Sequence, residues 1–118
     1  MRTVIVVEDE ALIRMLAAEV LEEAGFDVME FTNAADAMTF CREPANEVAA
    51  VFTDINMPGE LDGLDVAELV IRTRPNAAVI VTSGRYGLKP AGLSPDVTFL
   101  PKPWTAASLL TALEKAAG

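Results

Sequence analysis

Residues 48–59 read V-A-A-V-F-T-D-I-N-M-P-G, an apolar segment that ends in Asp54 and then enters a turn. A second apolar run, residues 4–7, is followed directly by Glu8 and Asp9. Short continuous apolar runs are typical of parallel strands that are buried on both faces. Ligands of open α/β sheets bind outside the carboxyl ends of such strands. The two acidic strand ends therefore predict a site at which several carboxylates meet.

The hydrophobic period alternates along the chain between short apolar runs and helical spacing, which is the pattern of βα units around a parallel sheet. Strands are expected at residues 3–7, 27–31, 48–54, 77–81 and 97–100. Helices are expected at residues 10–24, from the cap at Asn33 to Pro44, at 64–73, and from the cap at Thr105 to 116.

The stretch between the fourth and fifth strands breaks this rhythm. Three glycines and two prolines fall where a helix is expected, which leaves room for a turn or two: Gly84, Gly87, Pro90, Gly92 and Pro95. The prediction is a flavodoxin-like, doubly wound (βα)5 fold with a five-stranded parallel sheet and a short or irregular fourth helix. The length of 118 residues fits one domain, residues 1–118.

Composition narrows the classes of function. The chain has no histidine, which excludes histidine triads, histidine zinc sites and a histidine phosphocarrier. A net charge of −9 without a basic cluster argues against nucleic acid and anionic membranes as partners. The one cysteine, Cys41, favours a reducing compartment and a buried helical position. No signal segment precedes the first strand, so we expect a cytoplasmic protein.

Functional side chains follow four of the five predicted strands. Glu8 and Asp9 follow the first strand, Asp54 ends the third, and Ser83 and Lys102 follow the fourth and fifth. Taken singly, each has an ordinary explanation as a helix-start acid, a turn residue or a solvated charge. Their joint position at one sheet edge indicates a site instead.

The residues of this edge suit phosphoryl transfer. A carboxylate such as Asp54 can attack phosphorus and form an acyl phosphate, a reaction that depends on positioning and charge neutralisation. Mg²⁺ prefers oxygen ligands, here Asp9, Asp54 and a backbone carbonyl near Asn56. The Lys102 ammonium would neutralise the other side of the phosphate, and the Ser83 hydroxyl would donate to a third oxygen.

The order and spacing of these residues resemble the receiver domain of two-component response regulators over essentially the whole chain. The matching segments are V-V-E-D-E at 6–10, D-I-N-M-P-G at 54–59, L-D-G at 61–63, T-S-G at 82–84 and P-K-P-W at 101–104.

The resemblance implies that Asp54 accepts a phosphoryl group from a histidine kinase or phosphotransfer protein. It also implies a Mg²⁺ site formed by Glu8, Asp9, Asp54 and the Asn56 carbonyl. Ser83 and Lys102 would sense the phosphoryl group, with a cis bond between Lys102 and Pro103. Phe99 falls where such domains carry a rotating aromatic residue. The resemblance thus implies that the protein is a phosphorelay switch and that it catalyses only its own phosphorylation and dephosphorylation.

This chain departs from the family pattern at three places. The first acid is Glu8 where aspartate is more common, the loop from Asp54 to Gly63 is one residue longer, and the fourth helix is largely lost. The last departure affects the face that contacts downstream targets in the family. Arg85, two places after Ser83, is predicted to face the phosphoryl site and to tune the lifetime of the phosphorylated state.

Several alternatives stay open at this point. A pseudo-receiver would only bind partners, and the chain would equally fit a receiver excised from a hybrid histidine kinase. The end of the chain soon after the last helix favours a stand-alone receiver, expected to be a monomer or weak dimer with an unknown downstream protein target. A haloacid-dehalogenase-type phosphatase is disfavoured, since Asn56 stands where its motif needs a second acid.

Overall fold

The structure is a computed structural model that describes residues 2–84 and 89–117. Its centre is a sheet of five parallel strands in the order β2-β1-β3-β4-β5. This is the strand order of flavodoxin-like folds, so the predicted fold class is confirmed. The strands are β1 (Thr3–Val7), β2 (Asp27–Phe31), β3 (Ala50–Asp54), β4 (Ala78–Ser83) and β5 (Thr98–Pro101).

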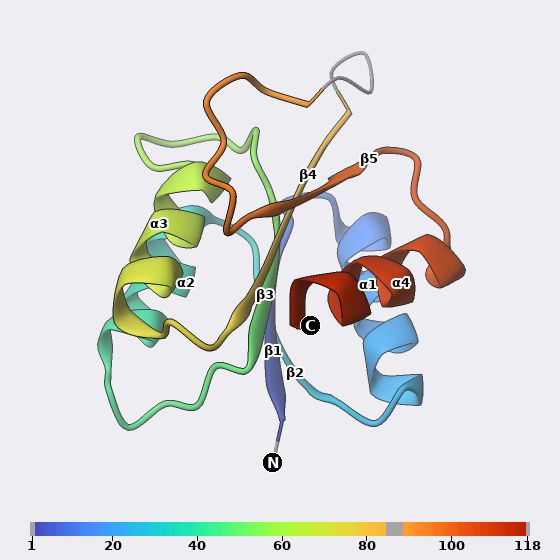
Figure 1. Cartoon of the computed structure of the whole chain (residues 1–118), viewed down its shortest axis with the longest axis horizontal. Helices are drawn as coiled ribbons and strands as arrows, with labels where there is room; N and C mark the ends of the chain where they lie inside the picture. Colours follow the sequence, from blue (N-terminus) through green and yellow to red (C-terminus); the bar gives the residue numbers. More distant parts are fainter. Residues whose placement is uncertain (1, 85–88, 118) are drawn as a thin grey trace.

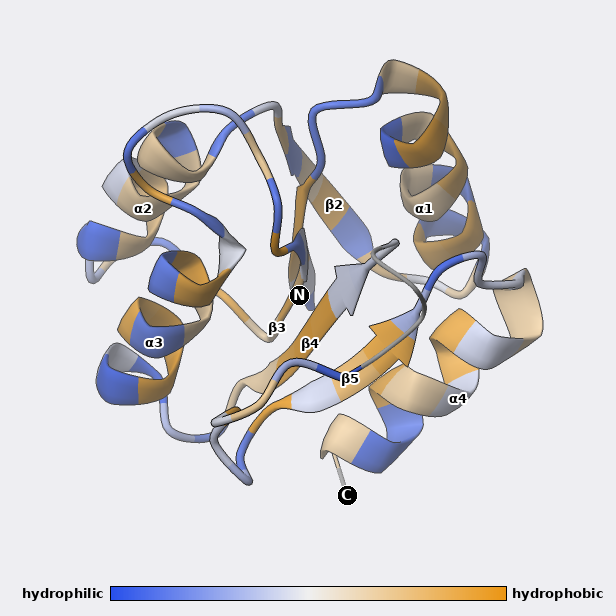
Figure 2. Cartoon of the chain, turned by 90° about the horizontal axis from the view of Figure 1, so that it is seen from above, coloured by the Kyte–Doolittle hydropathy of each residue, from blue (hydrophilic) through white to orange (hydrophobic). Residues whose placement is uncertain are grey.

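Helices cover both faces of the sheet (Figure 1), with α2 and α3 on one face and α1 and α4 on the other. In the described part of the chain the helices are α1 (Ala11–Glu23), α2 (Ala34–Arg42), α3 (Gly63–Thr73) and α4 (Ala106–Ala117). Seen from above, α2 and α3 turn their hydrophobic residues toward the sheet and their hydrophilic residues away (Figure 2). The sheet and its helices therefore form three layers with two cores.

The two cores follow from the alternation of side chains along the strands. Ile5, Val51 and Val79 lie in the core beneath α2 and α3, whereas Val6 and Phe52 lie in the core beneath α1 and α4. Strands β1, β3 and β4 are buried along their full length. Because the three central strands are held from both faces, their carboxyl ends form a firm platform for the side chains that follow them.

Most predicted elements are confirmed, and the differences are at their ends. Strand β4 continues through Ser83, because Ser83 pairs with Pro101 on β5. Strand β3 begins at Ala50, two residues later than predicted, and β5 is shifted by one residue to Thr98–Pro101. Cys41 is buried in α2, as predicted.

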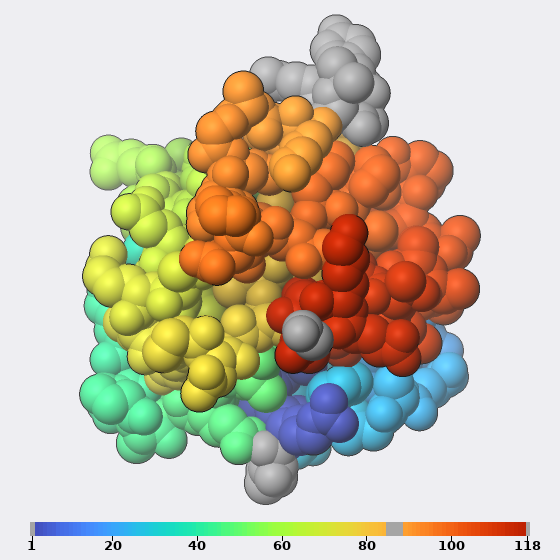
Figure 3. Space-filling model, viewed as in Figure 1, coloured from blue at the N-terminus to red at the C-terminus, as the bar shows by residue number. Residues whose placement is uncertain are grey.

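The described residues between β4 and β5 form an irregular segment where the fourth helix was expected. Residues 84 and 89–97 contain no helix, and Gly92 has a φ of 79°, which L side chains rarely adopt. Residues 89–97 lie over the upper part of the surface between α3 and α4 in this view (Figure 3). Arg85 lies outside the described residues. Nowhere in the ranges 2–84 and 89–117 does a helix have the length and apolar character needed to cross a bilayer.

Candidate phosphoacceptor site

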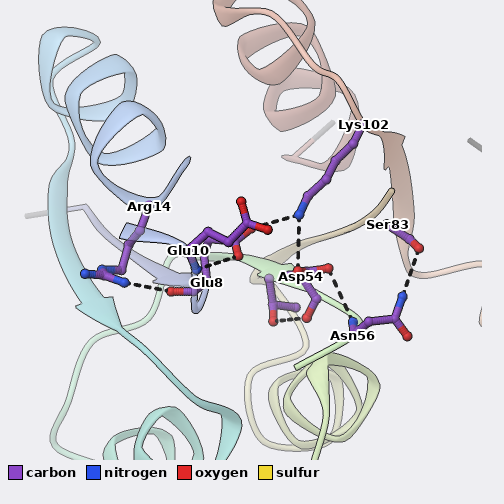
Figure 4. Close-up of polar contacts among 8 residues, drawn as sticks. Glu8, Glu10, Arg14, Asp54, Asn56, Ser83 and Lys102 are labelled. Atoms are coloured by element: carbon purple, nitrogen blue, oxygen red, sulfur yellow. Dashed lines mark hydrogen bonds and ion pairs between the residues drawn. The ribbon is translucent and has the colours of Figure 1, made fainter. Parts of the chain in front are cut away.

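Asp54 ends the central strand β3 and points into a group of polar side chains at the carboxyl edge of the sheet (Figure 4). It is 6% exposed. Its Oδ1 accepts a hydrogen bond from the Asn56 backbone N–H at 3.3 Å, and its Oδ2 accepts one from Lys102 Nζ at 3.2 Å. The main chain is fixed as well, since Ile55 N–H donates to the Thr82 carbonyl at 2.9 Å. Asp54 is therefore a nearly buried carboxylate whose orientation is fixed by hydrogen bonds to both of its oxygens.

Glu8 directly follows β1 and is 2% exposed. Its Oε2 accepts a hydrogen bond from the Glu10 N–H at 3.1 Å, and its Oε1 lies 3.1 Å from Lys102 Nζ. Burial raises the pKa of the Glu8 carboxyl, with a smaller contribution from the nearby charge of Asp54; the hydrogen bonds from Glu10 and Lys102 oppose the rise. The longer side chain of glutamate thus reaches the same lysine as Asp54 does.

Lys102 follows β5 and joins the two carboxylates. Its ammonium forms ion pairs with Glu8 at 3.1 Å and with Asp54 at 3.2 Å. Burial alone would lower its pKa, but the hydrogen bond to Glu8 and the charges of Asp54 and Glu8 outweigh burial and raise it. The peptide bond between Lys102 and Pro103 is cis, as predicted. The lysine is thus a firmly charged group at the centre of the site.

The carboxylates of Glu8, Asp9 and Asp54 meet the requirements of a hard cation. One oxygen from each residue lies within 4.8 Å of the others. Asp9 is exposed while Glu8 and Asp54 are buried, so the group opens to solvent on one side. Mg²⁺ binds oxygen ligands, usually one or two carboxylates together with several waters, and this solvent-open group supplies such carboxylates. The residues present therefore fit the predicted metal, while nothing observed bears on the Asn56 carbonyl as a ligand.

Ser83 and Asn56 form a second polar pair beside Asp54. The Asn56 side-chain amide donates to Ser83 Oγ at 3.1 Å, and this hydrogen bond joins the loop after β3 to the end of β4. Ser83 is 3% exposed. Phe99 is half-buried and packs against the core beneath α2 and α3. The structure thus brings six of the predicted residues together at one edge: Glu8, Asp9, Asp54, Asn56, Ser83 and Lys102.

Sequence reasoning missed two residues that shape the site. Gly63 stands where a Cβ would collide with the Asp54 carbonyl oxygen and come within 2.9 Å of Ile55 Cα, so only glycine fits there. Arg14 donates from Nη1 to the Glu8 carbonyl at 3.0 Å. Gly63 lies in the L-D-G segment that matches the family, but that match assigns it no role, and nothing in the sequence pattern distinguishes Arg14 from a surface arginine.

Comparison with known proteins gives a consistent result. A model of the family described as response regulator receiver domain matches residues 4–114. The sensor kinase CckA of Brucella abortus is 32% identical over 116 residues, which covers 96% of this chain and 12% of the kinase. The chemotaxis protein CheY of Thermotoga maritima is 29% identical over 118 residues, which covers 97% of this chain and 96% of that protein.

A solved structure agrees with these sequence matches. The crystal structure of a response regulator receiver protein from Sinorhizobium medicae superposes with a TM-score of 0.86 at 29% identity. The superposition covers 98% of this chain and 93% of that one. Similarity of fold and sequence therefore extends over almost the whole chain.

Proposed function

The chain belongs to the response regulator receiver domain family, and from this we propose that Asp54 accepts a phosphoryl group from a histidine kinase or phosphotransfer protein in a Mg²⁺-dependent reaction. Receiver domains are signalling switches of two-component systems, and the proposal extends to residues 1–118 as one such domain. The observation that carries it is the buried Asp54 carboxylate, held between Lys102 and the cluster with Glu8 and Asp9.

In the proposed reaction, a carboxylate oxygen of Asp54 attacks the phosphorus of a phosphohistidine. The new O–P bond forms as the P–N bond breaks, and the imidazole leaves with the electron pair of that bond. Asp54 becomes an acyl phosphate, and attack by water on its phosphorus later returns the carboxylate and inorganic phosphate. A buried nucleophile with both oxygens already oriented needs little rearrangement for this attack.

Charge neutralisation supports this chemistry. Glu8, Asp9, Asp54 and the Asn56 carbonyl would hold Mg²⁺, which supplies positive charge to the phosphoryl oxygens. Lys102, which follows β5 at the same edge of the sheet, supplies a second positive charge as a compact ammonium group. In its present position the ammonium contacts the Glu8 and Asp54 carboxylates, so it already lies beside the side chain that would carry the phosphoryl group.

The switch would start at Ser83 and Lys102. A dianionic phosphoryl group on Asp54 attracts both donors, and the Ser83 hydroxyl, whose oxygen accepts from the Asn56 amide, would turn its O–H toward a phosphoryl oxygen. Phe99, half-buried on β5, would follow as the aromatic part of the switch. The irregular segment after residue 88 replaces the fourth helix, so we expect the downstream protein target to bind by a different mode.

A protein donor would contact α1 beside the site. Leu12, Met15 and Leu16 share one helix face at i, i+3 and i+4 and are exposed by 82%, 59% and 51%. This apolar face begins three residues after Asp9, so a donor seated on it would reach Asp54. A cytoplasmic location agrees with such a partner. Changing Leu12 and Leu16 together to serine should slow transfer from a protein donor but not from acetyl phosphate.

The direct test is intact mass after incubation with Mg²⁺ and acetyl phosphate. The protein should gain one phosphoryl group, and the gain should disappear with a chelator or in Asp54→Asn, whose side chain is nearly isosteric. Labelling that persists in Asp54→Asn would refute the assignment. No gain despite measured Mg²⁺ binding would favour a pseudo-receiver, and transfer from a kinase domain in the same polypeptide would favour a hybrid-kinase origin.

A further inference from the structure

Arg14 lies in the first turn of α1, outside the set of residues that the proposed reaction uses. Its side chain is 18% exposed and points back toward the carboxyl end of β1 (Figure 4). Nη1 donates to the Glu8 carbonyl at 3.0 Å, and Nε lies 3.5 Å from the Glu30 carboxylate on β2. The guanidinium therefore joins three elements: the turn after β1, the start of α1 and the edge strand β2.

These contacts complete the fixation of the Glu8 main chain. The Glu8 N–H donates to the Phe31 carbonyl at 3.0 Å, and its carbonyl accepts from Arg14. The Glu10 N–H donates to the Glu8 side chain. Glu10 is also the N-cap residue of α1, and its own side chain makes no capping hydrogen bond. Arg14 is thus the link between the helix and the backbone of the turn.

Asp9 depends on this turn for its position. It is exposed, and it stands between Glu8 and Glu10, whose backbone groups are held as described. A metal ligand on a short turn is placed by the main chain on either side of it. If the Glu8 carbonyl is released, the turn gains freedom and the carboxylates of Glu8 and Asp9 separate more easily under their mutual repulsion.

We propose that Arg14 is a positioning residue that fixes the β1–α1 turn so that Glu8 and Asp9 present their carboxylates together to a divalent cation. This inference rests on the proposed function for the identity of the cation. Its guanidinium suits the role because a planar group with several donors reaches a carbonyl and a carboxylate at once, which an ammonium cannot do. Partners beyond the direct ligands commonly change metal affinity by about 10- to 100-fold.

The test is Mg²⁺ titration followed by two-dimensional ¹H–¹⁵N NMR, which reports the Kd and the backbone of residues 8–11. Arg14→Ala should weaken Mg²⁺ binding by roughly 10-fold or more, with faster amide exchange at Glu10. Arg14→Lys keeps the charge and should recover only a small part of the loss. Glu30→Gln should cause a smaller loss, and Arg72→Ala, an exposed charge on α3, should leave the Kd unchanged.

Thermal unfolding of the metal-free protein in a chelator shows whether Arg14→Ala changes the stability of the fold, separately from its effect on the Kd for Mg²⁺. An Arg14→Ala variant that loses stability but keeps the wild-type Kd would overturn the positioning role, as would full recovery of the Kd in Arg14→Lys. Absence of Mg²⁺ binding to the unmodified protein would overturn both the metal site and the role of Arg14. Normal Mg²⁺ binding without phosphoryl uptake would refute the proposed function, while a weakened Kd in Arg14→Ala would still support the role of Arg14.

Discussion

Glu8 combines two properties that oppose each other, a nearly complete burial and a negative charge. Its pKa is raised because burial disfavours the charged form more than its hydrogen bonds favour it. The ionised Glu8 carboxylate therefore lowers the stability of the folded protein, and a bound cation would offset this cost. The same residue is therefore unfavourable for stability and useful for metal binding.

Glu8→Gln should stabilise the protein relative to wild type at neutral pH without divalent ions. A carboxyl whose pKa is raised by folding takes up a proton on folding, so the stability of wild type falls as the pH rises from its ordinary value of 4.5 through the raised value. As the pH falls below 4.5, the Glu8 carboxyl becomes neutral in the folded and the unfolded protein alike, so the stabilities of wild type and Glu8→Gln should converge. Thermal unfolding in EDTA from pH 4 to 8 measures the difference, and a gap that shrinks with rising pH would contradict this assignment.

Lys102→Met should bind Mg²⁺ more tightly and accept the phosphoryl group more slowly. The ammonium bonds to one oxygen each of Glu8 and Asp54, so it competes with the metal for the same carboxylates. Loss of a unit charge a few ångströms away is worth about 1 to 4 kcal/mol, so about a tenfold lower Kd is expected. Calorimetric titration checks it, with Lys115→Met on α4 as a control; a weaker affinity in Lys102→Met would show that the lysine supports metal binding.

Gly63 shows how one element constrains another. It begins α3, and its N–H donates to the Ile55 carbonyl at 3.1 Å, directly behind Asp54. The preceding residue, Asp62, caps the helix by accepting from the N–H groups of Leu64 and Asp65. Because Gly63 has no side chain, the start of α3 can pack directly against the end of β3, the strand that carries Asp54.

Gly63→Ala should destabilise the fold by about 1 to 3 kcal/mol, because the new methyl group collides with rigid backbone. It should also reduce labelling of Asp54, whose carbonyl must move. Gly84→Ala is the matched control, since its Cβ would make an ordinary contact of 3.5 Å with flexible Lys102 Cδ. Urea unfolding measures the stability of both variants. Equal unfolding midpoints would contradict the prediction, because they would mean that the first turn of α3 moves away from Asp54 without cost.

Elements with strong local signals could be predicted from the sequence, and their ends could not. Asn33 caps α2 by accepting from the Asp36 N–H at 2.8 Å, and Thr105 caps α4 by accepting from Ser108. The last residues of β4 are in the strand because they pair with β5, and the sequence of β4 alone carries no information about that pairing. Likewise the ion pair of Lys102 with Glu8 joins residues 94 positions apart, so the sequence could predict a shared edge but not this contact.

At the scale of the whole molecule, charge balance governs the response to salt. The chain carries 18 acidic and 9 basic residues, a net charge of −9 that repels itself in the compact state. Screening by salt reduces this repulsion, since the Debye length falls to about 10 Å at 0.1 M. Mg²⁺ therefore acts in two ways, by general screening and by binding at the acidic site.

MgCl₂ should raise the melting temperature more than NaCl at equal ionic strength. Specific binding adds about 1.4 kcal/mol at ten times the Kd, according to the linkage between binding and unfolding. Asp9→Asn should keep the response to NaCl and lose the excess due to Mg²⁺, because it removes one of three carboxylates. Identical curves for the two salts in wild type would rule out a specific site at this affinity.

The central claim is that Asp54 itself becomes an acyl phosphate. Borohydride reduces an aspartyl phosphate to homoserine, so reduction after incubation with Mg²⁺ and acetyl phosphate, followed by peptide mass spectrometry, identifies the modified residue. Homoserine at position 54, absent without Mg²⁺, is the predicted result. Homoserine at another carboxylate, or none at position 54 in a protein that has gained a phosphoryl group, would contradict the assignment.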